Sequence, residues 1–85
     1  MSTASGGLRA IPGVGPDLEQ HLHALGVFTP DDLRTQDAEA LYARDCALHG
    51  GRLDRCVLYV YRLAVYYAQH DTHDPEKLKW QNWKD

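Results

Sequence analysis

The sequence has little of several features that define larger or more specialised proteins. Its two cysteines are too few for a disulfide-rich secreted scaffold. Its longest apolar run, residues 56–61, is followed at once by Arg62 and is too short to cross a bilayer. With 85 residues, the chain is also too short for a multi-layer catalytic fold with a deep cleft. These absences exclude large enzymes and membrane-spanning proteins, and they favour one small domain.

The first seven residues contain no basic segment followed by an apolar one, so we expect no secretory signal. The cytoplasm is then the default location. We expect residues 1–7 to form a flexible leader and residues 8–85 to form a single domain. A hydrophobic content of 44% with 25% charged residues is ordinary for a folded soluble protein rather than a disordered one.

A basic excess, the usual sign of a nucleic-acid partner, is also missing. Twelve acidic residues against nine lysines and arginines give a net charge of −3, so the overall field repels nucleic acid weakly. The charges are unevenly placed, because residues 16–45 hold seven acids and two bases, whereas residues 51–62 hold three arginines and one acid. If the protein contacts an anion through charged side chains, we therefore expect those side chains in the second half of the chain.

Helix start and stop signals occur at short intervals. A Gly-Pro-Asp start at residues 15–17, leucines at helical spacing and a glycine stop predict a helix over residues 16–25. Thr29 with Asp32 resembles a capping box and predicts a short helix to about residue 34. Asp37 caps a third predicted helix, which ends before residues 49–51. Asp74 starts a last short turn. No hairpin of strands is indicated, so we expect an all-α fold.

The longest predicted element is a helix over residues 52–70. Its valines and tyrosines favour strands, but about 18 residues without glycine or proline exceed a usual strand. At 100° per residue, a broad apolar face that includes Cys56, Val60 and Leu63 lies opposite a face with Arg55 and Arg62. We therefore expect four to six short helices around a central, largely buried helix.

The most informative string runs from Leu8 to Leu18 and contains Ile11-Pro12-Gly13-Val14-Gly15-Pro16. We call residues 11–15 the Gly13 loop. Two glycines one residue apart before a helix start predict a tight turn whose main-chain N–H groups can hold a phosphate. The string resembles the hairpin of helix-hairpin-helix proteins, where this loop binds the DNA backbone without reading sequence. That resemblance implies a compact, SAM-like paired helix-hairpin-helix domain, with residues 49–51 as a degenerate second hairpin.

A second resemblance covers nearly the whole chain. Residues 54–62, residues 64–68 and the ending at residues 74–85 resemble the small bacterial pathogenicity-locus family. Members of that family are sometimes labelled mitomycin-resistance or DNA-binding proteins. The resemblance implies the same helix-hairpin-helix fold, and it says more about the fold than about the biochemical function.

One departure from DNA-binding hairpins concerns charge. Such hairpins often carry Lys or Arg directly after the second glycine, whereas this chain has Pro16 and Asp17. A carboxylate in the first helical turn competes with an incoming phosphate. The alternative interpretation is that the loop only joins two helices tightly, with Gly13 and Gly15 both supplying positive φ.

An arginine–tyrosine stripe is the other candidate interaction surface. Its members are spaced i, i+4, i+7 and i+11 along one side of the long helix: Arg55, Tyr59, Arg62 and Tyr66. Such groups contact phosphates or bases, or stack on one another. Trp80 and Trp83 must bury their rings, and the C-terminal segment carrying them is expected to pack on this stripe.

Metal and catalytic sites are not expected. Cys46, His49 and Cys56 have the right ligand types but not the paired spacing of a zinc site, and both cysteines are assigned to the core. No residue orients a Cys–His nucleophilic pair, and no phosphate-loop lysine is present. We expect no enzyme, no metal and no cofactor.

The leading hypothesis is a non-catalytic module that binds the DNA backbone weakly and without sequence preference. The candidate binding residues are Arg9, Pro12, Gly13, Val14, Gly15 and Arg52. Few phosphate contacts predict modest affinity with a shallow salt dependence. The alternative is a protein-interaction or self-association module that presents the acidic region of residues 16–45 or a helix face.

Overall fold

The computed structural model describes residues 7–84, and within that range the chain forms helices and no strands. The all-α class is therefore confirmed. The expected leader lies outside the described residues except for Gly7. The α-helices are α1 (Pro16–Ala24), α2 (Ala38–Leu48) and α3 (Arg55–Gln69). Single-turn 3₁₀ helices are η1 (Leu8–Ala10), η2 (Pro30–Leu33), η3 (Pro75–Leu78) and η4 (Trp80–Trp83).

The described part of the chain thus has three α-helices, fewer than the four to six short helices expected around the central one. Two of the expected short helices are 3₁₀ turns instead. Both η2 and η3 begin at a proline directly after a capping residue and span only four residues. Segments of that length favour the tighter i to i+3 hydrogen bonds of a 3₁₀ helix.

Side-chain caps set where the elements begin. The Asp37 carboxylate accepts a hydrogen bond from the Ala40 amide at 3.1 Å and starts α2. Asp54 does the same for the Cys56 amide at 3.1 Å, so α3 starts at Arg55 and not at residue 52. The capping box predicted for Thr29 and Asp32 is present at the start of η2.

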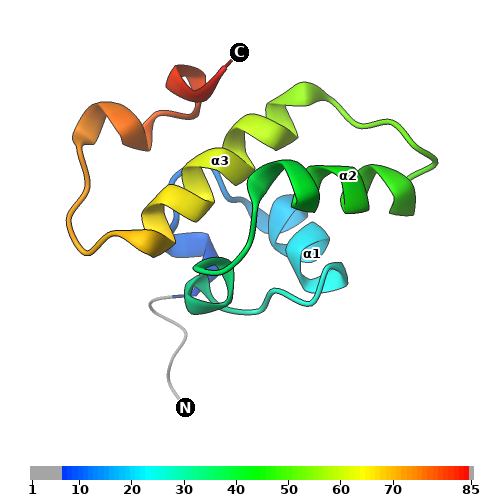
Figure 1. Ribbon diagram of the computed structural model, residues 1–85, viewed down its shortest axis with the longest axis horizontal. Coiled ribbons are helices and arrows are strands. Elements are labelled where there is room, and N and C mark those ends of the chain that lie inside the picture. Colours follow the sequence, from blue (N-terminus) through cyan, green and yellow to red (C-terminus); the bar gives the residue numbers. More distant parts are fainter. Residues whose placement is uncertain (1–6, 85) are drawn as a thin grey trace.

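Helix α3 runs through the middle of the molecule (Figure 1). It packs against α2, η2 and η4, while η1 packs on α1. Its buried residues are Leu58, Val60, Tyr61, Leu63 and Ala64. The placement of Cys56 in the core was wrong, because Cys56 is exposed in the first turn of α3, at the edge of the packed region. Cys46, on α2, is half-buried.

The C-terminal segment turns back along α3 after residue 70, and Figure 1 draws it on the side of α3 away from α2. Trp80 and Trp83 are half-buried against the core. Within residues 7–84, none of the helices has the length and apolar character needed to span a bilayer.

Candidate functional site

The Gly13 loop is built around one reverse turn. The Val14 amide donates to the Ile11 carbonyl oxygen at 3.1 Å, with Pro12 and Gly13 as the two central residues. Gly13 has φ +89°, the left-handed conformation that a proline–glycine turn of this kind requires. Gly15 has φ −98°, so the interpretation that both glycines supply positive φ is wrong for Gly15.

The start of α1, directly after this turn, has no side-chain cap. Its N-cap residue is Gly15, which has no side chain to accept a hydrogen bond, and Pro16 has no amide hydrogen. The Asp17 carboxylate accepts no hydrogen bond from a described residue, whereas aspartates cap both α2 and α3. The amides of Gly13 and Gly15 also donate to no described residue. The Gly13 loop therefore keeps two main-chain N–H donors, those of Gly13 and Gly15, without a partner among the described residues, whereas the Val14 N–H already donates to Ile11.

The charged side chains around the loop are few. Arg9 is 56% exposed, and its Nη1 lies 3.8 Å from Oε1 of Glu19 on α1. Arg52 is exposed on a different connection, the loop that precedes α3. Of the two candidate arginines, Arg9 is thus the one joined to α1 by an ion pair, and its charge is partly neutralised there.

The Gly13 loop rests on α3 and on the C-terminal segment. A Cβ added at Gly13 would lie 3.5 Å from Cγ1 of Val60 and 3.9 Å from Cδ1 of Trp80. These are ordinary van der Waals distances, so the loop is held against a buried helix rather than projecting into solvent alone.

The arginine–tyrosine stripe is partly an internal stack. The guanidinium carbons of Arg55 and Arg62 lie 5.9 and 5.8 Å from the centre of the Tyr59 ring. Farther along, the Tyr66 hydroxyl accepts a hydrogen bond from the Asp74 amide at 2.8 Å, and its ring lies 5.6 Å from that of Trp83. The C-terminal segment thus covers the Tyr66 end of the stripe.

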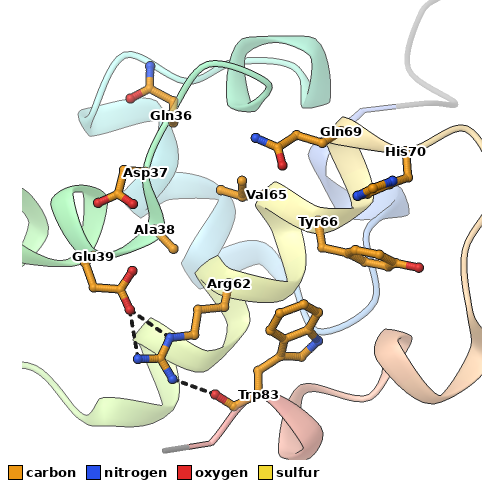
Figure 2. Close-up of a pocket in the computed structure, with 10 residues that line it drawn as sticks. All are labelled: Gln36, Asp37, Ala38, Glu39, Arg62, Val65, Tyr66, Gln69, His70 and Trp83. Carbon is orange, nitrogen blue, oxygen red and sulfur yellow. Dashed lines mark hydrogen bonds and ion pairs between the residues drawn. The ribbon is translucent and has the colours of Figure 1, made fainter.

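A surface pocket of about 390 Å³ adjoins this covered end. Figure 2 shows the Arg62 guanidinium between the Glu39 carboxylate and the main-chain oxygen of Trp83. The Arg62 Nη2 lies 2.8 Å from Oε2 of Glu39, and Nη1 donates to the Trp83 oxygen at 2.7 Å. The Arg62 guanidinium is therefore engaged in contacts within the protein. The lining residues are Gln36, Asp37, Ala38, Glu39, Arg62, Val65, Tyr66, Gln69, His70 and Trp83.

A polar cluster that the sequence analysis missed joins the three α-helices. Asp45 on α2 is fully buried, and its Oδ2 accepts hydrogen bonds from Nδ1 of His21 at 2.8 Å and from the Tyr61 hydroxyl. Burial, followed by the hydrogen bond to Asp45, raises the pKa of Tyr61. His49 lies one helical turn beyond Asp45, with Nδ1 3.2 Å from Oδ1 of Asp45. The i, i+4 spacing of Asp45 and His49 was the one sequence signal available.

The geometry defines a small all-helical protein with an uncapped helix start after a proline–glycine turn. A protein-family model described as Cdd1, pathogenicity locus, matches residues 2–85. The chain therefore belongs to the Cdd1 pathogenicity-locus family. No curated protein and no solved structure gave a match.

Proposed function

We propose that the protein is a non-catalytic, cytoplasmic helix-hairpin-helix module that binds the DNA backbone weakly and without sequence preference. The observation that carries the proposal is the uncapped start of α1, where Gly15 replaces the aspartates found at α2 and α3. Unpaired amides at a helix start attract phosphate oxygens. The exposed Arg9 is the nearest candidate for a supporting cation.

The electrostatic balance limits the expected affinity. Asp17 and Glu19 lie in the first turn of α1, and Glu19 already pairs with Arg9. With few phosphates neutralised, the logarithm of the binding constant should fall only shallowly with the logarithm of salt concentration. Binding through main-chain amides should also be indifferent to base sequence.

The direct test measures fluorescence anisotropy of a labelled short duplex at low salt with the wild-type chain and the Asp17→Lys variant. We expect Asp17→Lys to tighten binding about tenfold, because it removes a carboxylate and adds a cation beside the loop. The matched control is Asp71→Lys, which makes the same charge change at an exposed bend outside the loop. Equal gains from both variants, or no wild-type binding at high protein concentration, would contradict the proposal.

Self-association or binding to another protein is the second candidate function. Phe28 and Leu48 are large apolar side chains that remain 59% and 58% exposed. Light scattering across a range of concentrations tests this candidate: a dimer that Phe28→Ser or Leu48→Ser dissociates would support it. A monomer at all concentrations would exclude self-association and leave binding to a different protein as the only form of this candidate function.

A further inference from the structure

Three side chains of metal-ligand type converge where α1 meets the end of α2. They are His21, Asp45 and His49, and one ligating atom of each lies within 4.8 Å of those of the other two. Asp45 lies in the last turn of α2, His49 is the C-cap residue of α2 four positions later, and α1 supplies His21. Two imidazoles and one carboxylate are a donor set that holds zinc with an open fourth position.

The buried carboxylate has one oxygen without a hydrogen bond. Oδ2 of Asp45 accepts from both His21 and Tyr61, but Oδ1 is buried and has no hydrogen-bond partner among the described residues. His49 Nδ1 lies 3.2 Å from Oδ1, yet it makes its hydrogen bond with the main-chain oxygen of Asp45 at 3.0 Å. A buried unpaired acceptor is unfavourable, and a cation bound there would satisfy it.

The surroundings suit an ion that enters from solvent. The side chains of His21 and His49 are 22% and 42% exposed, and their rings stack with centres 4.6 Å apart. Beneath them, the Tyr61 hydroxyl fixes the orientation of the Asp45 carboxylate. Hydrogen bonds of this kind to a ligating group are usual in protein metal sites.

We propose that His21, Asp45 and His49 bind one zinc-like divalent cation, with water at the fourth position. A ring nitrogen that ligates the ion must first lose its proton to solvent, together with any hydrogen bond that it donates to Asp45. Neither cysteine belongs to this cluster, and Cys56 is exposed in the first turn of α3. The zinc set rejected from the sequence was Cys46, His49 and Cys56, whereas this set keeps His49 and replaces both cysteines with His21 and Asp45. The ion would join α1 to α2, and the proposal is independent of DNA binding.

The test uses the full untagged chain after treatment with a chelator, titrated with Zn²⁺ by calorimetry. We expect one site of micromolar or tighter dissociation constant, and we expect His21→Gln and His49→Gln each to weaken it by at least about tenfold. His23→Gln is the matched control, because His23 lies on the same helix but stacks on Phe28 instead. The His23→Gln variant should bind Zn²⁺ with the affinity of the wild-type protein.

Two further measurements do not depend on the histidine variants folding. In the wild-type protein, one equivalent of Zn²⁺ should shift the imidazole NMR signals of His21 and His49 and leave those of His23 unchanged. A Cys46→Ser, Cys56→Ser double variant should retain the site. The proposal is overturned if the protein binds no Zn²⁺ at millimolar concentration or if the double cysteine variant loses the site. It is also overturned if Zn²⁺ shifts the imidazole signals of other histidines and not those of His21 and His49.

Discussion

Removing one hydroxyl group at the junction of the helices should measurably destabilise the fold. Tyr61 is fully buried, and its hydroxyl donates to Oδ2 of the fully buried Asp45. Tyr61→Phe keeps the ring and deletes only this donor. A hydrogen bond to a charged group contributes about 1.5–3 kcal/mol. Because His21 still donates to the same oxygen, we expect a loss of about 2 kcal/mol rather than the upper limit.

The assays are urea unfolding, which gives the free energy of unfolding, and thermal unfolding, which gives Tm, both followed by circular dichroism on the metal-free protein. For a domain of this size, a loss of about 2 kcal/mol corresponds to a fall in Tm of roughly 10 °C. Tyr59→Phe is the control on the same helix, because the Tyr59 hydroxyl makes no hydrogen bond to a described residue. If Tyr61→Phe costs no more than Tyr59→Phe, the carboxylate does not depend on this donor and the reasoning is wrong.

Of the three other predictions, two concern the stability of variants and one concerns an ionisation. Gly13→Ala should lower the free energy of unfolding by about 1–2 kcal/mol because φ is +89°, and Gly15→Ala, at φ −98°, should cost clearly less in the same denaturation assay. Leu63→Ala should cost about 3 kcal/mol, since Leu63 is fully buried, whereas Leu48→Ala at an exposed site should change little. The main-chain amides of residues 28 and 29 hold the pKa of Asp32 below the ordinary 3.8. Its stabilising effect is therefore present above pH 4 and is lost as the pH falls through that lowered pKa, and a carboxyl NMR titration with a midpoint at or above 3.8 would contradict this.

The features predicted correctly from the sequence are those set by a few neighbouring residues. The caps at Asp37 and Thr29 depend on side chains that reach amides within three residues, so the sequence pattern contains all the participants. The turn at Gly13 is local for the same reason.

The polar cluster could not be predicted in this way. Asp45 bonds to His21, 24 residues earlier, and to Tyr61, 16 residues later. The sequence analysis counted Asp45 only among the seven acids of residues 16–45, and a lone carboxylate is rarely buried. Its burial depends on donors from two other helices, which only the packed fold brings together. The error at Cys56 has a related cause, because periodicity gives the face of a helix but not where the packed region ends.

The indole of Trp80 lies beside the bend at Gly13: a Cβ added at Gly13 would be 3.9 Å from Cδ1 of Trp80. The protein therefore carries an intrinsic optical reporter at that bend. A molecule that settles on the exposed edge of Gly13 would change the polarity around this indole, so intrinsic emission can follow occupancy without any attached dye.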